Sequence, residues 1–176
     1  MNLLRQETAA GFDAPLELLQ ACHGRVEQQC ATLEKLIAHV GRHGGDAAAS
    51  QAAAGILKYF RQAAPLHHQD EEENLFPLLL ARLDGGHAAL ADLPALLERQ
   101  HRALDALWAR FEGMLDLLAQ GRSAALPADL AAEFIARNRV HLDLENSRIL
   151  PAARRLLTAA DLAELGQAMR ARRGLA

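Results

Sequence analysis

Four long stretches of the chain place apolar residues at alternating steps of three and four. This spacing is typical of a helix that packs one face into a bundle, whereas a half-buried strand alternates every second residue. In two of the stretches the predicted buried seam, the row of positions that faces the interior, extends as far as Leu78 and Arg148. The pattern predicts an all-α fold with long helices over residues 16–40, 57–78, 97–118 and 134–148.

Capping residues, glycine and proline mark where the first two helices begin and end. Asp13 can cap a helix that has Pro15 in its first turn, and the pair Gly44-Gly45 can end it. Asp46 then starts the second helix, which is expected to run to about residues 84–86.

The remaining helices are marked in the same way. Asp92, followed by a proline, predicts the start of the third helix, and Gly121 closes it. Pro127 opens the fourth helix, which fades near residue 157. Thr158 and Asp161 form a capping-box-like start for a short fifth helix.

Three prolines fall inside or near the ends of these helices. Pro65, Pro77 and Pro151 should kink the helical runs that contain them. Because the connections are short, sequential helices should pack antiparallel. We therefore expect an up-down-up-down four-helix bundle over about residues 13–157, followed by a short C-terminal helix over about residues 158–173, in a single domain of residues 1–176.

Composition excludes several classes of protein. The formal net charge is -3 and is spread along the chain, so no basic patch predicts nucleic-acid binding. No stretch reaches the roughly 20 apolar residues that span a bilayer, and residues 1–15 show no apolar core of a signal peptide. Cys22 and Cys30 lie eight residues apart, which favours free thiols in a reducing cytoplasm.

Each predicted long helix places one histidine on its buried seam, and two helices add a glutamate one turn further on. Buried carboxylates beside imidazoles are unfavourable unless something compensates, and a pair of divalent cations does so. Neutral imidazole is a common ligand for Fe, Zn and Cu, and a carboxylate can bridge two metals. The predicted ligands are His23, His67, Glu71, His101, His141 and Glu145.

Spacing along the chain supports a shared site. His23 lies about 21 residues before the first turn and His67 about 22 residues after it, so at roughly 1.5 Å per residue both should lie at one height. In addition, residues 67–77 and 141–151 share the pattern H-x3-E-x5-P. Two copies on alternate helices favour a metal site over a pair of exposed ion pairs.

These motifs resemble the hemerythrin-like HHE cation-binding family. The first copy reads H-x3-E-E-x-x-L-F-P and the second, more loosely, H-x3-E-N-x3-L-P. The resemblance covers the four long helices and is greatest to the four-His, two-Glu branch that includes bacterial iron-centre repair proteins. It implies two non-haem irons, oxo- or hydroxo-bridged, with both glutamates bridging them. The ligand types alone leave Mn and Zn open.

Two features depart from the known members of this family. Oxygen-carrying hemerythrins have H-x3-H on the third helix, whereas here His101 is followed by Asp105. The repair proteins carry a cysteine-bearing module ahead of the bundle, and these 176 residues show none. The first departure weighs against assigning oxygen carriage to this chain, and the second weighs against assigning iron-centre repair.

Other histidines are expected to lie outside the site. Along a continuous helix His39 and His43 would lie roughly 24 and 30 Å from His23, which predicts surface or turn positions. His68 and Glu72 are rotated about 100° from the seam. They are expected to support the ligands from outside or to be solvated.

Open positions on two metals suit a small ligand, reversible redox chemistry or metal release. The first hypothesis is a cytoplasmic di-iron protein that binds or senses a diatomic ligand, O2 or NO. The second is an enzyme or repair factor that reduces NO or peroxide, or donates iron to damaged centres, and the third is iron storage or handling. No nucleophile triad or phosphate loop is present in the sequence, which favours a binding protein over an enzyme. The sequence leaves open whether the chain forms a homodimer.

Overall fold

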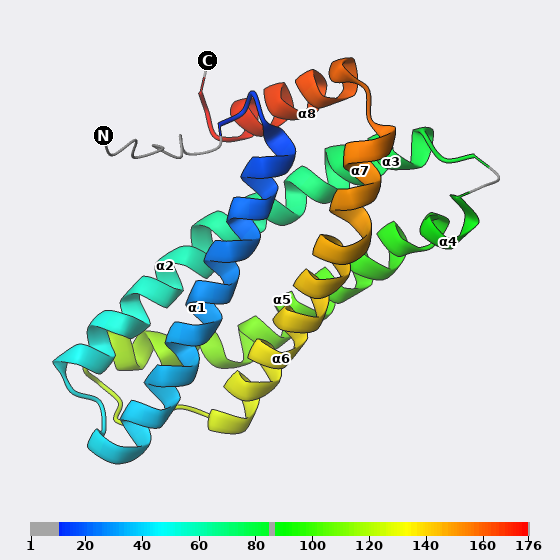
Figure 1. The fold of residues 1–176 in the computed structure, drawn as a ribbon. Coiled ribbons are helices and arrows are strands. Elements are labelled where there is room, and N and C mark those ends of the chain that lie inside the picture. Colours follow the sequence, from blue (N-terminus) through cyan, green and yellow to red (C-terminus); the bar gives the residue numbers. More distant parts are fainter. Residues whose placement is uncertain (1–10, 85–86, 176) are drawn as a thin grey trace, which may run out of the picture.

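The computed structural model describes residues 11–84 and 87–175, and within these residues all regular structure is helical. Four long helical runs pack antiparallel, and a short helix crosses one end of the bundle (Figure 1). In chain order the elements are α1 (Pro15–His43), α2 (Ala47–Asp70), the π-helical turn η1 (Glu71–Leu75), α3 (Phe76–Ala81), α4 (Ala88–Ala91), α5 (Leu93–Ala119), α6 (Ala128–Leu144), the π-helical turn η3 (Glu145–Ile149), α7 (Leu150–Leu156) and α8 (Ala159–Arg172).

The predicted architecture is confirmed. α2, η1 and α3 form one continuous run and α6, η3 and α7 another, so that with α1 and α5 they make the up-down-up-down bundle (Figure 1). α2 and α6 each pack mainly against α1 and α5, which places α2 and α6 on one diagonal. No helix of the described residues is both long and apolar enough to cross a membrane. The single-domain assignment of residues 1–176 remains a prediction. The turn at 85–86 and most of the expected signal-free N-terminus lie outside the described residues.

Two of the four predicted helix starts at capping residues have a side-chain cap; Asp92 is the N-cap of α5 but makes no side-chain cap hydrogen bond. Asp46 accepts a hydrogen bond from the Ala49 backbone N–H at 2.8 Å. Thr158 and Asp161 form the complete capping box at the start of α8. The cap predicted at Asp13 is wrong: α1 begins after Ala14 without a side-chain cap. The Asp13 side chain is fully exposed and lies 3.8 Å from an arginine of α8 instead.

Apolar side chains form two clusters, with the histidine and glutamate side chains at a level between them. One cluster includes Val26, Leu33 and Phe111 towards the α1–α2 turn. The other includes Leu19 and Leu75 towards α8. Along every long run, the buried positions pass from one cluster to the other at a histidine. The bundle therefore has a polar layer inside an otherwise apolar interior.

The two π-helical turns shift the buried seam by one residue. Leu79 is fully buried where the sequence predicted Leu78, and Ile149 is buried where it predicted Arg148, which is exposed. A π-turn contains one residue more than an α-turn would, so every position after it rotates around the helix. For this reason the prediction for Arg148 is wrong, whereas Leu78 is half-buried and still packs against the same apolar cluster.

Candidate metal centre

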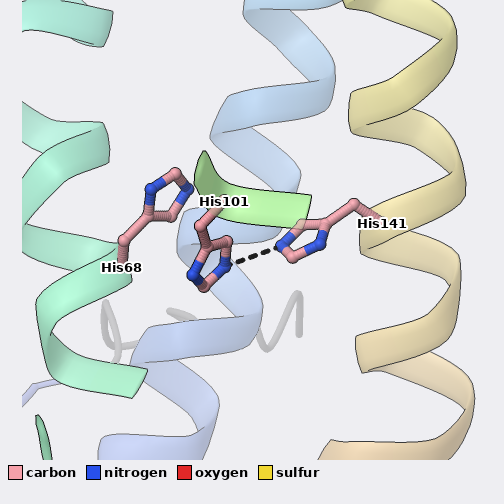
Figure 2. A group of neighbouring side chains, drawn as sticks. All are labelled: His68, His101 and His141. Atoms are coloured by element: carbon pink, nitrogen blue, oxygen red, sulfur yellow. Dashed lines mark hydrogen bonds between the residues drawn. The ribbon is translucent and has the colours of Figure 1, made fainter. Parts of the chain in front are cut away.

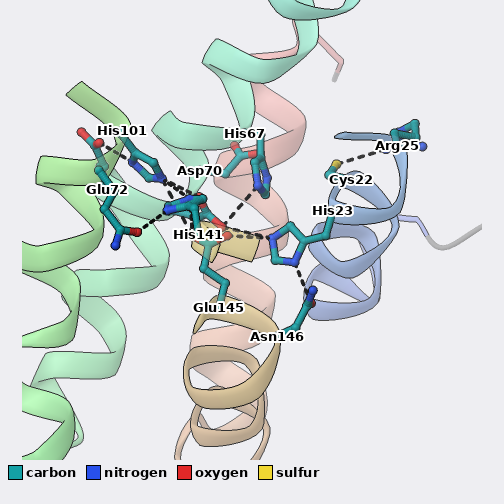
Figure 3. Close-up of polar contacts among 12 residues, drawn as sticks. Cys22, His23, Arg25, His67, Asp70, Glu72, His101, His141, Glu145 and Asn146 are labelled. Atoms are coloured by element: carbon teal, nitrogen blue, oxygen red, sulfur yellow. Dashed lines mark hydrogen bonds and ion pairs between the residues drawn. The ribbon is translucent and has the colours of Figure 1, made fainter. Parts of the chain in front are cut away.

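The structure brings all six predicted ligand residues to one level of the bundle. None of the six is more than 3% exposed. Figure 3 shows five of them pointing toward one another from the four helical runs. They are His23 from α1, His67 from α2, Glu71 from η1, His101 from α5, His141 from α6 and Glu145 from η3.

Each glutamate is the first residue of a π-helical turn. In η1 the carbonyl of Glu71 accepts a hydrogen bond from the N–H of Phe76, five residues on, and Glu145 and Leu150 repeat this in η3. The next residue is a proline in both copies. A proline ring clashes with the carbonyl four residues before it in a regular α-helix, and a wider turn relieves the clash. The H-x3-E-x5-P repeat therefore has a structural cause as well as a chemical one.

The first pair of histidines comes from the hairpin α1–α2. The Nε2 atom of His23 lies 3.5 Å from Glu71 Oε1 and 3.3 Å from Glu145 Oε2. The Nε2 atom of His67 lies 3.4 Å from the same Glu71 Oε1. These four residues form one group of ligand atoms that lie within 4.8 Å of one another.

The second pair comes from α5 and α6 and faces the other oxygens of the same carboxylates. His101 Nε2 lies 3.5 Å from Glu71 Oε2, and His141 Nε2 lies 3.1 Å from Glu145 Oε1. These residues form a second group with ligand atoms within 4.8 Å of one another. Each carboxylate thus presents one oxygen to each histidine pair, which is the arrangement of a ligand that bridges two metals.

Several polar atoms in this layer are buried without a hydrogen-bond partner. They include Nε2 of His23, both ring nitrogens of His67, Oε2 of Glu71 and both carboxylate oxygens of Glu145. A buried polar atom without a partner is destabilising, and an isolated buried charge more so. Cations between the two histidine pairs would satisfy all these atoms except Nδ1 of His67. The residues present therefore fit a metal centre.

Comparison with known proteins agrees with this geometry. The family model of the hemerythrin HHE cation-binding domain matches residues 14–153. The chain belongs to this family. A Haemophilus influenzae protein, named only as an uncharacterized protein, is 32% identical over 173 residues that make up 98% of each chain. Its name gives no activity with which this chain could be compared.

Outer hydrogen bonds orient three of the four imidazoles in this hemerythrin-like centre. An oxygen acceptor at Nδ1 keeps the proton there and leaves Nε2 free to bind a metal. Glu72, which was expected either to support a ligand from outside or to be solvated, is one of the three partners. The other two partners were not predicted, although each is a direct sequence neighbour of a ligand. The contacts are His23 Nδ1 to Asn146 Oδ1 at 2.8 Å, His101 Nδ1 to Glu72 Oε1 at 2.6 Å and His141 Nδ1 to Gln100 Oε1 at 2.8 Å.

Electrostatics distinguish the two carboxylates. Burial, together with the neighbouring Glu145, raises the pKa of Glu71 well above its usual range. Burial also acts to raise the pKa of Glu145, but His141, His101 and His23 outweigh it and hold that pKa well below its usual range. The two carboxylates therefore differ in how readily each one loses its proton, and binding of a cation to both favours their charged forms.

His68 lies against this centre without joining the carboxylate groups. Its ring stacks on that of His101, with centroids 3.9 Å apart and planes 11° apart (Figure 2). Its ring nitrogens come within 4.8 Å of those of His101 and His141. Burial lowers the pKa of His68 to about 3, so its ring is neutral. Asp105, at the position where oxygen carriers have a histidine, is 71% exposed and lies 3.9 Å from His68.

The histidines expected to lie elsewhere do so. At the end of α1, His39 contacts Asp46 at 3.0 Å and its ring lies 4.8 Å from that of His43. Cys22 and Cys30 are free, buried thiols. Burial raises the pKa of Cys30 to about 12.

Proposed function

We propose that this hemerythrin-like protein holds two non-haem irons and binds or senses a small diatomic ligand, O2 or NO. The observation that carries the proposal is the division of oxygens in the centre. Glu71 and Glu145 each offer one oxygen to the His23–His67 pair and one to the pair on α5 and α6. His23, His67, His101 and His141, with both glutamates, would hold the two irons, and these would supply sites for a small ligand and reversible redox chemistry.

The donor set favours iron over the other candidates. Zinc ordinarily takes a closed tetrahedral site with a single metal. Imidazole and carboxylate together suit iron, and two irons supply reversible redox chemistry as well as open coordination positions. Manganese would have the same donors available, so elemental analysis has to decide between the two.

On the His68 side, the space beside the centre is small. A cavity of about 30 Å³ lies between α2, α5 and α6 and is bordered by His68, whose ring covers His101. Much of its wall is apolar, with Phe60, Trp108 and Phe134 among the lining residues. A space of this size admits one molecule of about the size of water. Together with the burial of all six ligands, it supports a diatomic ligand rather than a larger substrate.

A second candidate function is the donation of iron to damaged centres. An open groove of about 420 Å³ reaches His23 between α1 and the α6–η3 run. Its lining includes Gln20, Glu27 and Asp143. Asn146, which is exposed, accepts the hydrogen bond from His23 Nδ1 in the same groove. This face would give a metal acceptor a polar approach to one ligand.

Metal analysis followed by rapid mixing tests both candidates. Protein purified from its own cells is expected to contain two irons per chain. The reduced protein is then mixed with O2, NO or peroxide in a stopped-flow spectrometer. A stable adduct with O2 or NO supports the binding function, turnover of NO or peroxide supports an enzyme, and rapid iron loss supports a donor. Uptake of many more than two irons supports storage, and protein that binds no iron refutes the proposal.

A further inference from the structure

The C-terminal helix ends against the turn that carries Glu71. Asp70, the residue directly before this glutamate, is fully buried. Arg172 and Arg173 both donate hydrogen bonds to its carboxylate, Arg172 to Oδ1 and Arg173 to Oδ2 at 2.6 Å. The buried Asp70 carboxylate, beside a predicted metal ligand, is therefore paired with two guanidinium groups from near the C-terminus. Asp70 is labelled in Figure 3.

Arg172 extends this contact along the whole π-helical turn. Its Nη2 atom donates to Glu73 Oε2 at 2.8 Å and to Asn74 Oδ1 at 2.7 Å. The rigid fork of one arginine thus binds residues 70, 73 and 74, on both sides of the Glu71 peptide. A π-turn is a local interruption of a regular α-helix, so contacts from outside the run can determine how the turn is held.

The other end of α8 is fixed to the same helical run. Asp161, in the first turn of α8, accepts two hydrogen bonds from Arg82, at 2.9 and 2.7 Å. Arg82 is the residue that ends α3. Contacts from α8 therefore hold the segment between residues 70 and 82 at both of its ends.

The body of α8 is packed closely between these ends. Leu165 and Met169 are fully buried and share an apolar cluster with Leu75 of η1. At Gly166 the helix approaches the carbonyl oxygen of Phe12 so closely that a side chain would collide with it. Because α8 is fixed in one position, the residues that its arginines bind are held in place as well.

We propose that Arg172 and Arg173 are positioning residues for Glu71, holding its π-helical turn so that the carboxylate stays between the two histidine pairs. The inference rests on the proposed role of Glu71 as a metal ligand. Both arginines act through residues 70, 73 and 74, and in the described chain neither is bonded to the Glu71 carboxylate. Loss of this support should loosen the metal while leaving the bundle folded.

The test is the rate at which a chelator removes metal from Arg172→Gln protein. Asp70 keeps Arg173 as its partner in this variant, so no buried carboxylate is left unpaired. Outer partners of metal ligands are typically worth ten- to a hundredfold in affinity, and we expect release to be about tenfold faster. The control is Arg170→Gln on the same helix, since Arg170 contacts Asp13 and the ring of Phe12. Equal release rates for the two variants would overturn the proposal.

Two further variants separate this proposal from others. Asn74→Ala removes one acceptor of Arg172 on the far side of the contact and should also speed release, even if Arg172→Gln folds poorly. Glu71→Gln tests the ligand itself. If Glu71→Gln releases metal like the unaltered protein, the ligand assignment fails. If Glu71→Gln loses metal but Arg172→Gln and Asn74→Ala match the control, only the positioning role fails.

Discussion

Replacement of Glu71 by leucine should change stability in opposite directions with and without metal. Glu71 is 1% exposed, and its Oε2 atom has no hydrogen-bond partner. Burial and the neighbouring Glu145 raise its pKa, which favours the neutral acid in metal-free protein, within a polar layer between two apolar clusters. Leucine has a similar volume and no polar atom, so Glu71→Leu should stabilise the metal-free protein.

The size of both effects can be worked from the burial of this residue. An unpartnered buried polar group destabilises by about 1–3 kcal/mol, and replacing such a group with a fitting apolar one recovers about 2 kcal/mol. For a chain of this length that corresponds to a rise in Tm of about 4–8 °C. The unaltered protein should gain about 4 kcal/mol at a free metal concentration of about 1,000 Kd, and Glu71→Leu should gain almost nothing.

Thermal unfolding by circular dichroism, with chelator and with ferrous iron under anaerobic conditions, measures both differences. Glu71→Gln is the matched control, because it removes the ligand but keeps a buried polar group, and it should lose the metal response without the gain in metal-free stability. If Glu71→Leu has a lower Tm than the unaltered protein in chelator, the inference that the buried Glu71 side chain destabilises the metal-free protein is wrong. If it keeps the full metal-dependent increase in Tm, Glu71 is not a ligand.

Three other predictions follow from the same structure. His67→Ala should lose bound iron and metal-dependent stability together, whereas His43→Ala, on the exposed end of α1, should keep two irons per chain by elemental analysis. Thr158→Ala should lower stability by about 1 kcal/mol, read as a Tm lower by about 2–4 °C, because it removes the cap of α8. Hydrogen bonds from Arg82 hold the pKa of Asp161 below its usual range. The stabilisation of the folded protein by this ion pair is therefore fully present above about pH 4 and is lost as pH falls toward the lowered pKa. Metal-free Arg82→Gln should therefore show a smaller loss of stability between about pH 5 and pH 2 in urea titrations, and an unchanged acid dependence would contradict this.

Local signals in the sequence were enough to predict most of the fold. The cap at Asp46 and the capping box at Thr158 depend on contacts within three residues, which sequence shows directly. The convergence of His23 and His67 follows from counting residues on each side of one turn, because the rise per residue of a helix is fixed. The meeting of the six candidate ligand residues at one level could be predicted because each helix places a histidine on its buried seam at the same depth.

The features that could not be predicted depend on contacts between distant parts of the chain or on small changes of helical geometry. The π-turns rotate the later seam positions, and the sequence showed only the prolines that follow them. The pairing of Asp70 with Arg172 joins residues 102 positions apart, and no local pattern reports such a contact. Asp13 had the right residue type for a cap, but in the structure its side chain turns away from the helix toward α8.

The division of ligands between the two halves of the bundle has a mechanical consequence. The hairpin α1–α2 with η1 supplies His23, His67 and Glu71, and the hairpin α5–α6 with η3 supplies the other three donors. In the proposed centre each cation would take an oxygen from both glutamates. Neither hairpin alone would therefore supply all the ligands of either cation. A bound pair of ions would therefore link two halves that otherwise meet through apolar packing, hydrogen bonds such as His23–Asn146 and surface ion pairs such as Arg139–Glu27. Removal of the ions would let the halves separate more readily than either half unfolds.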